Sequence, residues 1–180
     1  QGNRVAGWLK GKGVRKGDRV AILAKNYPQF FPLMGGIAAA GAIMVPINFR
    51  LSAEEIGYNL TNTQPAMIVV DPDFEKTVSE LRSICPSLRE FVTFGPPSGI
   101  YISFDSLLKS QPAEAVELDG DDPFVIMHTA AVQGKPRGAV ISHHNLIFCT
   151  LQNIAIMGLT REESYLNILP LFHIAGMFAA

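Results

Sequence analysis

The stretch from residue 128 to residue 146 combines the residue types and the spacing best suited to chemistry. In order it reads His-Thr-Ala-Ala-Val-Gln-Gly-Lys-Pro-Arg-Gly-Ala-Val-Ile-Ser-His-His-Asn-Leu. A loop of small residues between two strands can turn several backbone N–H groups toward one anion, and cations such as Lys135 and Arg137 can neutralise phosphate charge. The pattern therefore indicates a phosphate-binding loop.

This loop is not a Walker loop. That motif needs Gly-x-x-x-x-Gly-Lys-Ser/Thr leading into a helix. Here Thr129 stands in the place of the first glycine, and Pro136 follows the lysine. Loop chemistry taken by itself is therefore a weak indication of phosphate binding.

Composition limits the classes of partner. Fifteen basic residues against sixteen acidic ones leave a formal net charge of −1, so the chain has no basic field to attract nucleic acid or anionic lipid. Small metabolites are the expected partners. Cys85 and Cys149 lie far apart and fit no CxxC or Cys/His spacing, which argues against a disulfide scaffold or a structural metal site. A cytoplasmic location is expected.

The chain alternates apolar runs with turn signals, which predicts an α/β fold with mainly parallel sheets covered by helices. One helix is expected to begin at a cap on Asn3, and another at a cap on Ser52. Residues 95–122 are rich in proline and are the expected subdomain linker. The predicted strands cover 19–24, 42–46, 66–70, 90–94, 124–128 and 138–141. Apart from the two helices with these caps, the predicted helices cover 29–40, 73–84, 105–110 and 143–157.

The two ends of the chain suggest a fragment. Residue 1 is glutamine, and residues 164–180 carry no charge and finish on an apolar run. Domains rarely stop in this way, because such a run normally packs against something. From about Leu166 onward we expect disorder or burial against another copy. Residues 26–49 are uncharged as well, but their prolines and glycines argue against a membrane span.

Four segments, in order, resemble the AMP-forming acyl-CoA synthetases and their adenylate-forming superfamily, which includes luciferases and adenylation domains. The phosphate loop of that family reads roughly Tyr-Thr-Ser-Gly-Thr-Thr-Gly-x-Pro-Lys-Gly-Val, followed by Ser-His-x-Asn-Leu. Residues 129–146 match it in register, and the other three segments are Gly17 to Ile22, Ala39 to Asn48 and Leu169 to Gly176. The resemblance covers nearly the whole chain.

The resemblance implies that residues 1–180 are an incomplete N-terminal (AMP-binding) domain. The implied enzyme is an AMP-forming acyl-CoA ligase of fatty acid metabolism, which uses ATP, Mg²⁺ and coenzyme A to activate a carboxylic acid. The fragment by itself is expected to be inactive, since the family's adenine-binding segments and catalytic lysine follow residue 180. No metal ligand is expected in this chain, and association into a homodimer stays open.

The same resemblance assigns the site residues. Arg137 stands where the family has a lysine and is the expected catalytic cation, and His173 falls at a position that lines the acyl-substrate pocket. The phosphate-binding residues are expected to be Thr129, Ala130, Ala131, Val132, Gln133, Gly134, Lys135 and Arg137. From the residues alone, a buried histidine bonded to a backbone carbonyl is the favoured interpretation of His173. His143 and His144 are expected to begin or cap a helix, and His128 to pack at a strand end.

The phosphate loop departs from the family pattern in residues 130–133. Ala130, Ala131, Val132 and Gln133 replace Ser-Gly-Thr-Thr, so hydroxyl donors are missing. Each lost hydrogen bond to a charged phosphate costs roughly 1.5–3 kcal/mol, while the backbone N–H groups remain. The altered loop keeps one rival open, a non-catalytic homologue with a degenerate phosphate loop. A second rival, an adenylation domain that loads a carrier protein, stays open because this sequence does not distinguish the two acceptors.

Overall fold

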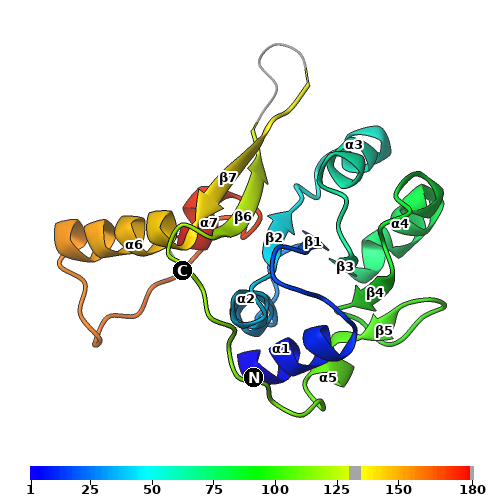
Figure 1. Ribbon diagram of the computed structural model, residues 1–180. Coiled ribbons are helices and arrows are strands. Elements are labelled where there is room, and N and C mark those ends of the chain that lie inside the picture. Colours follow the sequence, from blue (N-terminus) through cyan, green and yellow to red (C-terminus); the bar gives the residue numbers. More distant parts are fainter. Residues whose placement is uncertain (130–134, 179–180) are drawn as a thin grey trace.

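The computed structural model describes residues 1–129 and 135–178, and within them one mixed sheet forms the centre of an α/β fold (Figure 1). The order of its seven strands is β5-β4-β3-β1-β2-β6-β7. All neighbours run parallel except β6 and β7, which form an antiparallel pair. The strands are β1 Arg19–Leu23, β2 Ile43–Pro46, β3 Met67–Val70, β4 Glu90–Thr93, β5 Ile102–Ser103, β6 Pro123–His128 and β7 Gly138–Ser142. The predicted α/β fold is confirmed.

Helices cover both faces of the sheet, which explains why the strands read as continuous apolar runs. Along β1, Val20 and Ile22 face the core beneath α1, α2 and α5, whereas Ala21 and Leu23 face the core beneath α3 and α4. The α-helices are α1 Gly2–Gly11, α2 Phe30–Ala39, α3 Ala53–Thr63, α4 Glu75–Leu81, α5 Phe104–Leu107, α6 His143–Met157 and α7 Ile174–Phe178. The 3₁₀ turns η1 Pro72–Phe74 and η2 Arg82–Ile84 flank α4, so the helix predicted over 73–84 is α-helical only in its middle.

The two predicted helix caps have different outcomes. Ser52 caps α3 as predicted: its hydroxyl accepts a hydrogen bond from the Glu55 N–H, and the Glu55 carboxylate accepts one from the Ser52 N–H. The prediction for Asn3 was wrong, because α1 begins at Gly2 and Asn3 lies inside its first turn. The carbonyl of Asn3 instead accepts a hydrogen bond from the N–H of Ala113 at 2.9 Å.

Residues 95–122 pack against the N-terminal helices. After β5 and α5 the chain runs along α1 and α2, where the Ala113 N–H bonds to Asn3 and the Val116 N–H donates to the carbonyl of Ala39 at 2.9 Å. Lys10 donates to the carbonyl of Glu114 at 2.6 Å. The segment, drawn in green in Figure 1, thus lies as a strap along the helical layer before it enters β6. Its role as a subdomain linker stays a prediction.

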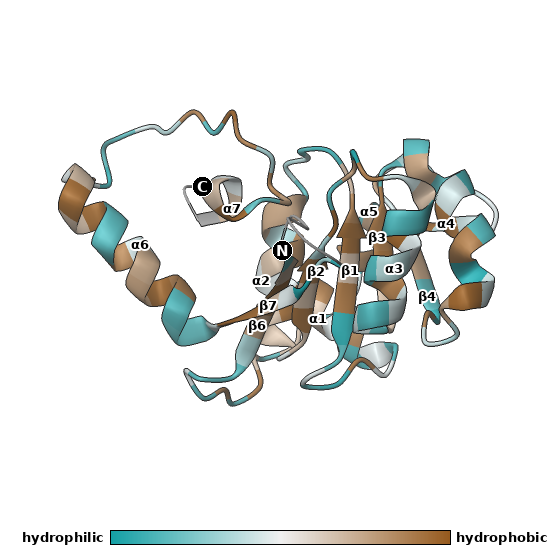
Figure 2. Ribbon diagram, turned by 90° about the horizontal axis from the view of Figure 1, so that it is seen from above, coloured by the Kyte–Doolittle hydropathy of each residue, from teal (hydrophilic) through white to brown (hydrophobic). Residues whose placement is uncertain are grey.

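The C-terminal segment divides into an exposed part and a packed part. Leu171 and Met177 are buried in the core beneath α1 and α2, so the expectation of disorder or an intermolecular contact from Leu166 onward was wrong for these two residues. The preceding helix α6 has no buried residue and projects away from the sheet (Figure 2). Among the described residues, no helix is long and apolar enough to cross a membrane.

Candidate functional site

The described part of the phosphate-loop motif follows β6 at Thr129 and precedes β7 at Lys135 to Arg137. Strand register runs from Val125 opposite Ile141 to His128 opposite Gly138, and beyond it Thr129 and Arg137 pair. The Thr129 N–H donates to the Arg137 carbonyl at 3.0 Å. Thr129, Lys135 and Arg137 are exposed, as predicted for a loop between two strands. Ala130, Ala131, Val132, Gln133 and Gly134 lie outside the described residues, so their predicted phosphate contacts stay predictions.

Helix α3 supports the hairpin from one side. The Tyr58 hydroxyl donates to the Pro136 carbonyl at 3.0 Å, and the Lys135 ammonium lies 5.6 Å from the centre of the Tyr58 ring. One turn further along α3, Asn62 Oδ1 lies 3.2 Å from His128 Nε2. Neither Tyr58 nor Asn62 was among the predicted site residues. Their four-residue spacing, which places both on one face of a helix, was the available signal.

A cavity of about 520 Å³ opens between the hairpin, α3 and the C-terminal segment. Three of the four family-like segments meet there. The hairpin supplies Thr129 and Pro136, the C-terminal segment supplies Phe172 and His173, and the segment Ala39 to Asn48 supplies its last residue. The residues that line the cavity are Pro46, Asn48, Leu51, Glu55, Asn59, Met127, His128, Thr129, Pro136, Ala139, Ile141, Phe172, His173 and Ile174. Of the predicted site residues, Thr129 and His173 are therefore brought together around one hollow, whereas Lys135 and Arg137 are not part of its lining.

His173 is an exposed residue of the cavity wall, so the alternative of a buried histidine bonded to a carbonyl was wrong. Its Nδ1 accepts a hydrogen bond from the N–H of Ala175 at 3.2 Å. A nitrogen that accepts carries no proton, so the neutral ring holds its proton on Nε2. The ring therefore has a donor free to meet an anionic oxygen.

Two other polar side chains of the cavity carry an acceptor without a partner among the described residues. Asn59, only 2% exposed, has an unpaired Oδ1, and His128 has an unpaired Nδ1. Burial lowers the pKa of His128, because desolvation disfavours the charged imidazolium. His128 packs at the end of β6 as predicted, and it additionally faces the cavity.

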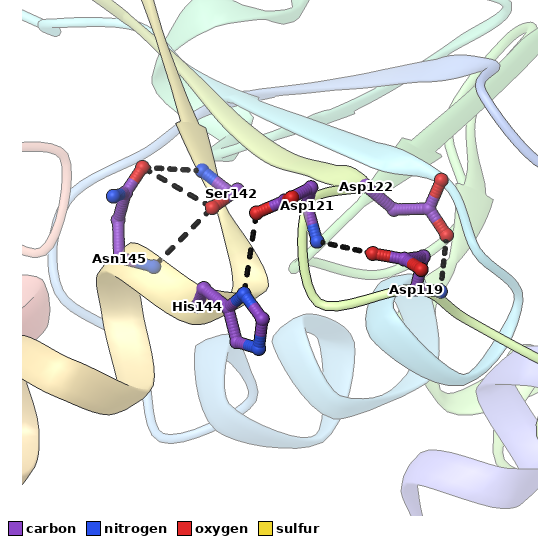
Figure 3. Close-up of polar contacts among 6 residues, drawn as sticks. All are labelled: Asp119, Asp121, Asp122, Ser142, His144 and Asn145. Carbon is purple, nitrogen blue, oxygen red and sulfur yellow. Dashed lines mark hydrogen bonds and ion pairs between the residues drawn. The ribbon is translucent and has the colours of Figure 1, made fainter.

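The start of α6 explains the Ser-His-x-Asn part of the motif. Ser142 and Asn145 form a reciprocal cap, with the Asn145 N–H donating to Ser142 Oγ at 3.2 Å and the Ser142 N–H donating to Asn145 Oδ1 at 3.1 Å (Figure 3). His144 bonds to Asp121 at 3.2 Å, and the ring of His143 lies 4.9 Å from that of Phe124. Both histidines thus lie in the first turn of the helix, as predicted.

The chain belongs to the AMP-binding enzyme family, whose pattern it matches over residues 1–180. It is 37% identical to a crotonobetaine/carnitine–CoA ligase of Escherichia coli O6:K15:H31 (strain 536 / UPEC) over 96% of this chain and 35% of that protein. The chain thus spans about a third of the length of the curated relatives it matches.

Solved structures show the same fold. A Rhodopseudomonas palustris CGA009 protein, assigned as a long-chain-fatty-acid CoA ligase, superposes with a TM-score of 0.93 at 37% identity, over 98% of this chain and 44% of that one. The anthranilate CoA ligase AuaEII in complex with anthranoyl-AMP superposes with a TM-score of 0.89 at 27% identity, over 95% of this chain and 34% of that one. The fold is therefore that of the N-terminal part of the adenylate-forming enzymes.

Proposed function

We propose that the full-length protein is an AMP-forming acid–thiol ligase, of which residues 1–180 form part of the N-terminal domain. A carboxylate oxygen attacks the α-phosphorus of ATP, the bond to the bridging oxygen breaks, and pyrophosphate leaves. The thiolate of coenzyme A then attacks the acyl carbon of the adenylate, which gives the thioester and AMP. The observation that carries the proposal is the cavity in which the phosphate hairpin meets the His173 segment.

The hairpin would serve the first step. Its backbone N–H groups and Lys135 hold phosphate charge, and Arg137 assists the departure of pyrophosphate because its planar guanidinium can donate two parallel hydrogen bonds. The phosphate contacts proposed for Ala130 to Gly134 come from backbone N–H groups. They therefore do not depend on the side-chain hydroxyl groups that this loop lacks.

His173 would orient the acid. With its proton on Nε2, the ring can donate to a carboxylate oxygen while Nδ1 stays bonded to the Ala175 N–H. The acyl-adenylate bound in the anthranilate ligase supports a site for such an intermediate in this fold.

ATP, coenzyme A and Mg²⁺ are the proposed co-substrates and cofactor. Within the described residues no three His, Cys, Asp or Glu side chains lie close enough to hold a metal ion. Phosphate oxygens of ATP would supply ligands of Mg²⁺, which is the usual mode of binding for that ion. Mg²⁺ would neutralise phosphate charge during the displacement.

The test is acid-dependent exchange of labelled pyrophosphate into ATP, measured on the full-length protein with short, long and aromatic acids and with carnitine-like acids. Exchange with at least one acid, followed by thioester formation on adding coenzyme A, is the expected result. Exchange without thioester formation would favour a carrier-protein acceptor. Silence across the panel, together with no ATP binding by calorimetry, would favour the non-catalytic homologue.

A further inference from the structure

Asn26 joins two parts of the chain that are far apart in sequence. It lies three residues after β1, and its side-chain amide meets the backbone on either side of Pro170. Its Nδ2 donates to the carbonyl of Leu169 at 2.9 Å, and its Oδ1 accepts from the N–H of Leu171 at 2.8 Å. The Asn26 amide thus uses both its donor and its acceptor on backbone groups that lie 143 and 145 residues further along the chain.

These two bonds restrain the segment that carries His173. Leu171 is buried in the core, and the ring of Phe172 meets the ring of Phe49 edge-on at 5.2 Å. The His173 N–H then donates to the Pro170 carbonyl at 3.0 Å, which closes a turn. Asn26 therefore fixes the backbone immediately before the turn on which His173 enters the cavity.

No other side chain of similar size reproduces this pattern. Aspartate keeps an acceptor for the Leu171 N–H but places a negative charge against the Leu169 carbonyl. Leucine has the same shape but neither donor nor acceptor, so the peptide groups of residues 169 and 171 would lose their partner. No local pattern around Asn26 indicates this role, because its partners lie 143 and 145 residues further along the chain.

We infer that Asn26 is a positioning residue for acid activation, which acts by holding the Leu169–Leu171 backbone and thereby the orientation of His173. The inference rests on the proposed function, since it assigns the purpose of this contact to the acid site. Asn26 touches no substrate in this scheme. Its effect passes through His173.

The decisive experiment compares Asn26→Ala and Asn26→Asp with wild type in the full-length protein, using acid-dependent pyrophosphate exchange. Both variants should raise the KM for the acid at least about tenfold, because small displacements of a positioning group are costly, while the KM for ATP stays within about twofold. Ser87→Ala is the matched control. It removes a side-chain bond to a distant backbone carbonyl, at 2.9 Å from Pro65, together with a 3.3 Å contact to Cys85 Sγ, and Ser87 does not line the cavity.

A double-mutant cycle separates positioning from general stability. If Asn26 acts through His173, adding Asn26→Ala to His173→Ala should change the KM for the acid by less than about twofold. An equal effect of Asn26→Ala in both backgrounds would overturn the inference, as would a control variant that raises the KM equally.

Amide hydrogen exchange tests the contact without any assay of activity. The Leu171 amide should exchange at least about tenfold faster in Asn26→Ala than in wild type, with the β1 amides unchanged. Unchanged exchange at Leu171 would overturn the inference even in an active enzyme. A wild-type protein that shows no pyrophosphate exchange with any acid would overturn the proposed function, and with it the assignment of Asn26 to an acid site. Faster amide hydrogen exchange at Leu171 in Asn26→Ala would still establish the contact in that case.

Discussion

Tyr58 holds the described end of the phosphate hairpin through two contacts of different kinds, a hydrogen bond to Pro136 and a cation–π contact with Lys135. Tyr58→Phe removes only the hydroxyl, so we expect the KM for ATP to rise about fivefold, the equivalent of one net hydrogen bond. Tyr58→Leu removes both contacts and should raise it further. Tyr165→Phe, at an exposed tyrosine, is the matched control. Equal KM values for all three variants would remove Tyr58 from loop positioning.

Arg137 is exposed at the hairpin tip, with its backbone rather than its side chain paired to Thr129. Arg137→Ala should lower the rate of adenylation roughly 10²–10³-fold, the usual effect of removing one group that stabilises developing charge. Arg137→Lys should keep most of the rate, since it restores the cation of the family pattern. The measurement is pyrophosphate release with saturating acid and ATP, with Arg161→Ala as control. Unchanged release in Arg137→Ala would exclude the residue from the mechanism.

Residues that act through neighbours in sequence were predictable, and those that act across the fold were not. Thr129 and Arg137 belong to one short motif, whose local pattern already indicates a loop between strands. Tyr58 reaches a carbonyl 78 residues away, and Asn26 reaches one 143 residues away. The spacing of Tyr58 and Asn62 indicates a shared helix face, but it does not indicate which carbonyl Tyr58 meets, and no local signal indicates the partners of Asn26. Both contacts exist only after the sheet has formed.

At the scale of elements, the close packing of α1 on α2 depends on Gly36. A Cβ at Gly36 would lie 2.5 Å from the Val5 Cβ and 3.0 Å from the Gly2 carbonyl oxygen. Gly36→Ala should therefore lower the free energy of unfolding by about 1–3 kcal/mol, as overpacking does. Gly35→Ala is the matched control, because nothing lies within 4 Å of its Cβ position, and it should stabilise α2 by up to about 1 kcal/mol. Urea denaturation of both variants decides the matter, and an unchanged midpoint for Gly36→Ala would contradict the prediction.

Local signals predicted most helices and strands because each element has its own periodicity and its own turn residues. The buried parallel strands are apolar runs in the sequence, and the pair of Ser52 and Glu55 predicted the start of α3. The two-residue strand β5 escaped prediction, since it is too short to show any period and exists through pairing with β4. Asn3 was predicted as a cap from its residue type, whereas α1 begins one residue earlier, at Gly2.

At the scale of the whole molecule, two partly buried histidines couple stability to pH. Burial lowers the pKa of His128 and His143 below the ordinary 6.5, and each has a ring nitrogen without a partner among the described residues. The folded state thus favours neutral rings, while the unfolded chain takes up protons near pH 6.5. Stability contributed by the two rings is complete above that pH and is lost as the pH falls through their folded pKa values.

The free energy of unfolding should therefore decrease between pH 7 and pH 5. In the variant His128→Phe/His143→Phe the decrease should be shallower than in wild type, because the proton uptake on unfolding is smaller. Urea denaturation at half-unit pH steps measures both slopes. Identical slopes would contradict the coupling.

Helix α6 carries exposed apolar side chains that the described part of the chain does not cover, and Figure 2 shows the helix standing away from the sheet. Ile147, Leu151 and Ile154 share one face at helical spacing, and Phe148 beside them is 67% exposed. At roughly 25 cal/mol per Å², a few hundred Å² of such surface represents several kcal/mol, so the isolated chain should self-associate at micromolar concentration. Phe148→Ser/Leu151→Ser should restore the monomer in sedimentation experiments, and that monomer should stay folded, because these side chains support no core. Ile84→Ser changes an exposed apolar residue of η2, away from α6, and should leave association unchanged. A wild-type chain that stays monomeric would show that the α6 face does not drive association.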